Sequence, residues 1–232
     1  MSLAARDLAL RELMDDPACD PDRLRATLQR FDTVNRLVSG WGRVYRRRIR
    51  PFLASLDRPA RVLDLGCGGG DVVARLAAAA ARDGLRAEWV GADPDPRAIE
   101  VASARAGGAV RVETAHSGDL LARGERYDLV VSNHVLHHLA GSERDGFVED
   151  SRRLSRGLVL HGDIERGRAA YGLYAIGITP LAPGTFLRTD GLRSIRRSYR
   201  RDELAAALGA PWRVERPAPF RLLATARGTA DD

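Results

Sequence analysis

The chain has 232 residues, enough for one domain with elaborations and a substantial core. Its formal charge is +6 and its pI is near 10.1, but every basic residue is arginine, so we interpret the charge as compositional bias and expect no nucleic-acid partner. Two cysteines, Cys19 and Cys67, are too few and too poorly spaced for a disulfide framework or a zinc site.

No apolar run approaches the roughly 20 residues that span a bilayer, so we expect no membrane span. The first residues also lack the basic-then-apolar order of a signal peptide. We therefore expect a soluble, cytoplasmic protein. The oligomeric state stays open, with a homodimer as one option.

The first 40 residues predict two helices. A short amphipathic helix is expected at 3–14, where leucines recur on one face. A second helix begins with Asp20 as its N-cap and Pro21 at its first position, and its apolar stripe runs to Val38.

Residues 39–40, Ser-Gly, break that helix, and a basic, aromatic segment follows up to Pro51. Because no strand signal precedes residue 61, we expect residues 1–55 to be a helical extension. It is either a packing element or a lid over a cofactor, with Trp41 and Tyr45 reaching inward.

Strands and helices alternate from residue 61 onward, which predicts an α/β fold with a doubly wound, Rossmann-like, mostly parallel sheet. The expected strands are 61–65, 87–92, 110–114, 127–132 and 158–161. The expected helices are 71–82, 94–106, a segment from 133 through His138, and one that Ser142 caps and that ends near 154. We place the domain at 56–232.

Unusual residues gather where the predicted strands end, namely the glycines of 66–70, Asp93, His116, Asn133 and His161. Ligands of such sheets bind beyond the carboxyl ends of the strands. These positions are therefore the candidate site.

The glycine-rich stretch 61–71 limits which ligand binds there. Asp93, at the end of the second strand, can accept both hydroxyls of a ribose, although it can also cap the helix that follows. A dinucleotide fingerprint fails, because Asp71 replaces its third glycine, and no Gly-Lys-Ser/Thr follows to make a P-loop. A nucleoside cofactor without phosphate and with a cationic sulfonium suits these residues better.

Three ordered segments carry a family resemblance. Residues 62–70, Val-Leu-Asp-Leu-Gly-Cys-Gly-Gly-Gly, resemble the first motif of the class I S-adenosylmethionine-dependent methyltransferases. Residues 91–95 resemble the second motif, and 127–139 resemble the strand-4 motif of the small-molecule branch, which includes ubiquinone and polyketide-type enzymes. More weakly, 201–204 resembles the helix before the family's closing antiparallel hairpin.

The resemblance implies S-adenosyl-L-methionine as cofactor. Its implied contacts are Asp64, Gly66, Cys67, Gly68, Gly70, Asp93, Pro94, His116, Ser117, Asn133 and His134. In the family pattern the glycines bring backbone against the methionine and ribose parts, Asp64 supports the turn, and Asn133 and His134 face the transferred methyl group. His116 stands where relatives often carry an acidic residue for the adenine amine, which is a departure.

An acceptor hydroxyl would need a base, and imidazole is the usual group near neutral pH. On a helix from Asn133, His137 lies one turn on, so it is our first candidate, and His161 is the second. Either histidine could instead be a packing residue. We expect no metal site, because the His-x-x-His-His run lacks a carboxylate at helical spacing.

Residues 162–199 are expected to be a substrate-facing insertion, with an apolar, aromatic lid at 169–181. Residues 190–199 resemble a stretch of quinone and polyketide-type methyltransferases, where an arginine could hold an acidic or phenolic acceptor or simply be solvated.

The expected function is methyl transfer to an oxygen, or an activated carbon, of a hydrophobic phenolic, quinone-like or polyketide molecule of secondary metabolism. One alternative is a nucleic-acid methyltransferase, although the Asn/Asp-Pro-Pro-aromatic motif is missing at 132–135. The other is a cofactor-binding auxiliary protein without catalysis. The acceptor and its reacting atom are not readable from the sequence.

Overall fold

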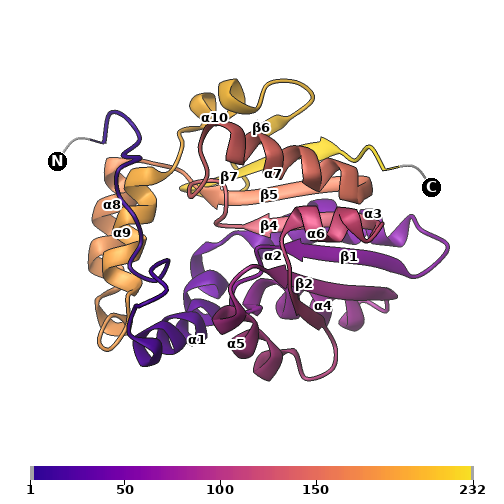
Figure 1. Ribbon diagram of the computed structural model, residues 1–232. Coiled ribbons are helices and arrows are strands. Elements are labelled where there is room, and N and C mark those ends of the chain that lie inside the picture. Colours follow the sequence, from indigo (N-terminus) through magenta and orange to yellow (C-terminus); the bar gives the residue numbers. More distant parts are fainter. Residues whose placement is uncertain (1–2, 231–232) are drawn as a thin grey trace.

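The computed structural model describes residues 3–230, which fold around one seven-stranded sheet of order β3-β2-β1-β4-β5-β7-β6 (Figure 1). The strands are β1 (Ala60–Leu65), β2 (Ala87–Asp93), β3 (Arg111–Thr114), β4 (Tyr127–Asn133), β5 (Ser155–Ile164), β6 (Arg213–Glu215) and β7 (Arg221–Arg227). Strands β1 to β5 run parallel, and β7 pairs antiparallel with both β5 and β6. The predicted doubly wound sheet and its closing hairpin are confirmed.

Helices cover both faces of the sheet. They are α1 (Pro21–Val38), α2 (Trp41–Val44), the π-helix η1 (Tyr45–Ile49), α3 (Arg50–Ala54), α4 (Asp71–Arg82), α5 (Pro96–Ala106), α6 (Ser117–Ala122), α7 (Gly141–Leu154), α8 (Arg168–Gly177), the 3₁₀ turn η2 (Thr179–Leu181), α9 (Leu187–Arg197) and α10 (Arg201–Leu208). None of the helices within residues 3–230 is long and apolar enough to cross a membrane.

The two faces of the sheet follow from strand alternation. Val62 of β1 lies in the core with α2, η1, α3 and α4, whereas its neighbour Leu63 lies in the core with α6 and α7. Adjacent residues of a strand point to opposite faces, so one strand contributes to both cores. The near-continuous apolar run of β1 is typical of a parallel strand buried on both sides.

Local signals placed several helix ends correctly. Asp20 caps α1 by accepting from the backbone N–H groups of Asp22 and Arg23, with Pro21 as the first helical residue. Helix α4 begins at Asp71, directly after the glycine turn. The N-cap of α5 is Asp95, so Asp93 does not cap that helix.

Three predicted local features are wrong. Residues 3–14 form no helix, because tertiary groups take their backbone hydrogen bonds: the N–H groups of Leu13 and Met14 donate to the carboxylate of Asp190. Residues 134–140 form turns and not a helix, beginning with a left-handed His134 (φ 63°). Helix α7 starts at Gly141, so Ser142 lies inside it and is not its cap.

The N-terminal part of the chain belongs to two different layers. Trp41, Ile49 and Leu53 are buried in the main core with the sheet, so residue 55 does not separate two cores. In contrast, α1 packs with α5 and with the segment at Phe186, and the stretch before it runs along α8 and α9 (Figure 1). Only the part before residue 40 is therefore placed to cover a site.

Candidate active site

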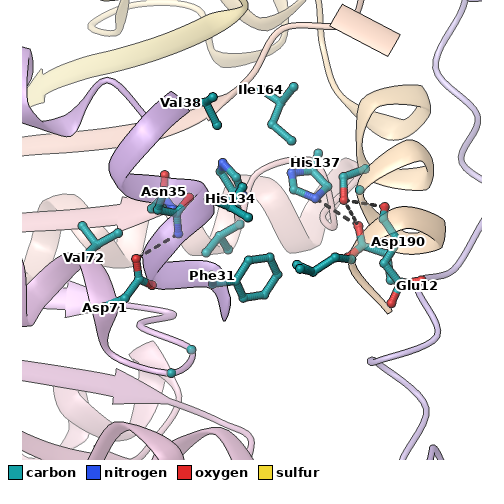
Figure 2. Close-up of a pocket in the computed structure, with 18 of the residues that line it drawn as sticks. Glu12, Phe31, Asn35, Val38, Asp71, Val72, His134, His137, Ile164 and Asp190 are labelled. Atoms are coloured by element: carbon teal, nitrogen blue, oxygen red, sulfur yellow. Dashed lines mark hydrogen bonds and ion pairs between the residues drawn. The ribbon is translucent and has the colours of Figure 1, made fainter. Parts of the chain in front are cut away.

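A cavity of about 950 Å³ lies beyond the carboxyl ends of β1, β2 and β4. We call one part the cofactor end, formed by Asp64, residues 66–69, Asp71 and Asp93. We call the other part the acceptor end, where Glu12, His134, His137, His138, Asp190 and Ser194 meet an apolar wall. Figure 2 shows Asn35 and Asp71 on one side of Phe31, and His137 with Glu12 on the other.

The glycine turn after β1 needs its glycines for two separate reasons. Gly66 has φ +75°, and a Cβ there would stand 2.6 Å from Val135 Cγ2. Gly68 has φ +53° and has open space where a Cβ would be, on the side of the cavity. The turn therefore offers bare backbone to a ligand.

Asp93 holds this turn in place. One of its carboxylate oxygens accepts from the backbone N–H of Gly68 at 2.8 Å, and the other accepts from the N–H of Asp95 at 2.9 Å. Burial raises the pKa of Asp93, an effect that these two N–H donors partly offset. Each oxygen keeps a further lone pair that can face a ligand in the cavity.

Asp64 is an unpaired buried carboxylate at the cofactor end. The residue is 1% exposed, and neither oxygen has a hydrogen bond of good geometry among the described residues, although the backbone N–H of Val73 slightly lowers the pKa of this carboxyl. Burial, together with the charges of Asp71 and Asp93, raises the pKa of Asp64 to about 8. A cationic or donor group of a ligand would satisfy this carboxylate.

Asp71, the first residue of α4, is better compensated. It accepts from Asn35 Nδ2 at 3.1 Å, the dashed contact in Figure 2, and lies 3.6 Å from the guanidinium of Arg75. Burial still raises its pKa above the usual range. Three carboxylates thus line one end of the cavity, which favours a cationic ligand and disfavours a pyrophosphate.

Apolar side chains from three helices wall the acceptor end. They are Phe31, Val34, Leu37 and Val38 of α1, Ile164 at the end of β5, Leu173 of α8, Leu181 of η2, Leu187 and Ile195 of α9, and Ile178 and Phe220 in connecting segments. Tyr174 also lines the cavity, and its hydroxyl donates to the backbone carbonyl of Leu187. Large apolar clefts with few polar groups bind hydrophobic small molecules.

His137 lies at the acceptor end between two carboxylates. Its Nδ1 is 2.7 Å from Asp163 Oδ1, and its Nε2 is 3.2 Å from Glu12 Oε1 (Figure 2). Burial alone would lower the pKa of His137, but the charges and hydrogen bonds of Asp163 and Glu12 outweigh burial and raise it to about 9. This histidine is therefore positively charged at neutral pH, which disfavours it as a general base.

His134 has the opposite character. Burial, and then the charge of Arg221, lowers its pKa to about 3, so its ring is neutral. Its Nε2 lies 2.6 Å from the Arg221 guanidinium, which donates, and its backbone N–H donates to the carbonyl of Gly162. A neutral ring that already accepts from arginine leaves Nδ1 as the protonated atom.

The structure brings most of the predicted site residues to this cavity. Asp64, Gly66, Cys67, Gly68, Asp93, Pro94, Asn133, His134 and His137 all line it. Burial raises the pKa of the Cys67 thiol well above its usual range, so it is an inert wall group here.

Four predicted residues do not reach the cavity. Gly70 packs its backbone against Ala102 of α5 instead. His116 is an exposed N-cap of α6, and Ser117 donates to the carboxylate of Asp150, so neither is placed for an adenine contact. His161 does not line the cavity either.

His161 faces Phe147 of α7 and Trp212, outside the cavity. Its ring is fully buried, its Nδ1 is 2.7 Å from Ser132 Oγ, and it stacks on Trp212. Burial lowers its pKa to about 3. We therefore withdraw it as a candidate base, because it is a packing residue in this fold.

Sequence reasoning missed the carboxylates that control His137. Asp163 follows His161 by two residues near the end of the buried part of β5, and a carboxylate at such a position was a usable signal. Glu12 offered no such signal, since it reaches the site from a segment without regular structure.

Comparisons with known proteins agree with this geometry. Residues 62–157 match the family model described as a methyltransferase domain. The ubiquinone biosynthesis O-methyltransferase of Chelativorans sp. is 36% identical to this chain over 124 residues, which cover 50% of this chain and 45% of that protein. The protein of the same name from Mesorhizobium japonicum is 35% identical over 136 residues, which cover 56% of this chain and 49% of that protein. The chain spans about half the length of the curated relatives it matches.

Solved structures share the fold at low sequence identity. The CurJ carbon methyltransferase has a TM-score of 0.63 at 16% identity, over 91% of this chain and 61% of that one. The plantazolicin methyltransferase BpumL, crystallised with SAH and a monoazolic desmethylPZN analog, has a TM-score of 0.59 at 12% identity, over 88% of this chain and 94% of that one. The Synechocystis magnesium protoporphyrin IX methyltransferase with bound SAM has 0.54 at 16%, over 92% and 100%.

The matched domain covers the glycine turn and Asp93, which belong to the cofactor end of the cavity, and also the end of β4. The sheet, with its antiparallel closing strand, is the fold of these solved structures. Residues 62–157 are thus similar to a methyltransferase domain, and the chain has the fold of solved methyltransferases.

Proposed function

We propose that this chain transfers the methyl group of S-adenosylmethionine to an oxygen, or an activated carbon, of a hydrophobic phenolic, quinone-like or polyketide molecule. One observation carries the proposal: a single cavity joins the acidic glycine turn to a chamber walled by apolar side chains. A cofactor at one end would present its methyl group to an acceptor at the other.

The residues of the cofactor end support the proposal that the cofactor is a cationic nucleoside. S-adenosylmethionine supplies an activated methyl on a sulfonium and carries an ammonium but no phosphate, which suits the three carboxylates there. In this proposal Asp93 holds the ribose hydroxyls. The unpaired Asp64 takes the ammonium, whose positive charge would return the pKa of this carboxyl toward its usual range.

The apolar wall of the acceptor end supports the proposal that the acceptor is a hydrophobic small molecule. The surroundings of His137 favour a role other than the general base that the sequence suggested. A charged imidazolium that donates to both Asp163 and Glu12 has no free nitrogen to remove a proton, so we propose that its charge instead holds these two carboxylates in place at the acceptor end. The two roles predict opposite pH profiles. A base would make turnover rise as pH approaches 9, whereas a group that acts through its positive charge would make turnover fall above it.

The proposal includes both oxygen and carbon as the acceptor atom, because the similar proteins include O-methyltransferases and a carbon methyltransferase. The test has two steps. Calorimetry with S-adenosylmethionine measures cofactor binding, and incubation with a panel of phenols, quinones and polyketides, followed by mass spectrometry, looks for an added methyl group.

Cofactor binding with a methylated product supports the proposal. Cofactor binding without a methylated product from any acceptor of the panel would favour an auxiliary protein. In that case the protein should support a partner enzyme's turnover equally well with S-adenosylhomocysteine in place of the methyl donor. Absence of cofactor binding would refute the proposal.

A further inference from the structure

Three side chains at the acceptor end bring metal-binding atoms together. Glu12, His137 and His138 each offer one such atom, and these atoms lie within 4.8 Å of one another. His137 Nε2 is 3.2 Å and His138 Nε2 is 3.6 Å from the same Glu12 Oε1. For metal–ligand bonds of about 2.1 Å, adjacent ligand atoms lie about 3.0 to 3.4 Å apart, so small adjustments would admit an ion.

The far nitrogen of each imidazole is also paired. His137 Nδ1 is 2.7 Å from Asp163 Oδ1, and His138 Nδ1 is 3.2 Å from Asp15 Oδ2. Histidines that bind metals usually donate this second N–H to a carboxylate, which fixes the ring and directs its other nitrogen at the ion. Here both rings are fixed in that way, and both Nε2 atoms point at Glu12.

The sequence offered no carboxylate at helical spacing from the histidines, and the fold supplies one from 125 residues away. Glu12 is itself positioned, because Ser194 Oγ donates to its Oε1 at 2.6 Å. The side chains of Glu12 and His137 are 5% and 1% exposed. All three candidate ligands line the cavity, so any further coordination positions would face an acceptor.

We propose that Glu12, His137 and His138 bind one divalent transition-metal ion at the acceptor end. Two imidazole nitrogens and one carboxylate suit Zn²⁺ and similar ions, whereas Mg²⁺ prefers oxygen ligands. The charges support a dication, since Glu12, Asp163 and Asp15 bring three carboxylates to two imidazoles.

The competing explanation is a buried ion pair in which Glu12 accepts hydrogen bonds from the two rings. The metal site itself does not depend on the proposed function, but the use of the ion to hold an acceptor oxygen does. Metal binding is therefore measured without cofactor or acceptor, so that its failure and the failure of methyl transfer are separate results.

The experiment uses the full chain without a histidine tag. Protein is loaded with Zn²⁺, dialysed against metal-free buffer and analysed by mass spectrometry for metal content, and Zn²⁺ affinity is measured by calorimetry. We expect about one Zn²⁺ per chain, at least a tenfold loss of affinity in Glu12→Gln and His138→Gln, and no displacement by millimolar Mg²⁺.

Two further variants keep the test decisive even where a buried substitution disturbs folding. Asp15→Asn changes only an exposed carboxylate behind His138, and we expect about a tenfold loss of affinity. Glu149→Gln, on the exposed surface of α7, is the matched control and should bind as the wild type does. Wild-type protein that retains no Zn²⁺, or equal binding in Asp15→Asn, His138→Gln and the wild type, would overturn the proposal.

Discussion

The two ends of the cavity are assembled in different ways. The cofactor end uses one continuous part of the chain, from Asp64 to Asp93, in which two parallel strands stop at the same edge of the sheet. The acceptor end uses side chains from residues 12, 137, 163 and 194, which lie on four separate segments.

The ends also differ in how their charges are compensated. At the cofactor end, Asp64 is buried, and neither of its oxygens has a hydrogen bond of good geometry among residues 3–230. At the acceptor end, His137 has a carboxylate at each nitrogen. We infer that the cofactor end is destabilised until a cation binds, whereas the acceptor end stabilises the fold without any ligand. The predictions below test that difference.

The largest effect is expected at the acceptor end. His137→Ala leaves Asp163 and Glu12 buried without their shared counter-charge, so the free energy of unfolding should fall by about 3 to 5 kcal/mol at neutral pH. Urea denaturation in EDTA measures it. Turnover should slow, while S-adenosylmethionine affinity by calorimetry should stay nearly intact.

The neighbouring His138→Ala is the control for this prediction. Its side chain is 28% exposed, so the loss of stability should be below about 1 kcal/mol. An equal loss of unfolding free energy in the two variants would mean that the contacts of His137 with Asp163 and Glu12 add no stability beyond that of an exposed histidine.

The opposite effect is expected at the cofactor end. Asp64→Asn keeps the shape but removes a buried charge, so the ligand-free protein should gain about 1 to 3 kcal/mol of stability at pH 8. The same variant should bind S-adenosylmethionine more weakly, because the ammonium loses its carboxylate. Thermal or urea unfolding and calorimetry measure the two quantities, and Asp202→Asn on the surface is the control.

The Asp64 substitution also has a pH signature. The folded-state pKa of Asp64, about 8, is above its ordinary 3.8, so its contribution to stability is complete below the lower value and is lost as pH rises toward 8. Ligand-free wild-type protein should therefore lose more stability across that window than Asp64→Asn. Parallel pH profiles of the two proteins would show that this carboxyl is not desolvated.

Asp93→Ala should weaken S-adenosylmethionine binding at least tenfold, or about 1.4 kcal/mol. Two losses contribute, the proposed ribose contact and the hydrogen bond that holds Gly68. Calorimetry measures the affinity, with Asp202→Ala as a control that should be unchanged. Unaltered binding in Asp93→Ala would remove the cofactor assignment.

The smallest effect concerns the link between the N-terminal part and the sheet. Trp41 Nε1 donates to Asn133 Oδ1 at 2.9 Å, at the end of β4. Trp41→Phe removes this hydrogen bond and should cost about 0.5 to 1.5 kcal/mol of stability, measured by urea denaturation. Cofactor affinity should hardly change, because Trp41 belongs to the core and does not line the cavity. A large loss of affinity would mean that Asn133 depends on this bond for its position.

Much of the fold was readable from the sequence because the signals are local. The alternation of apolar strands with capped helices predicted β1 to β5 and α4, and Asp20 with Pro21 located the start of α1. The closing hairpin was implied by the family resemblance alone. The cofactor end was predictable for the same reason: a glycine turn and an acid at the next strand end meet wherever parallel strands stop together.

What only the tertiary structure decided is the set of contacts between distant segments. Leucine periodicity at 3–14 predicted a helix, but Asp190 and Arg196 provide partners for that backbone, and Glu12 consequently reaches His137. His137 and His161 are the two candidate bases that the sequence offers. One is charged between two carboxylates and the other is neutral against Trp212, because burial and partners, which no local pattern encodes, set the pKa of each.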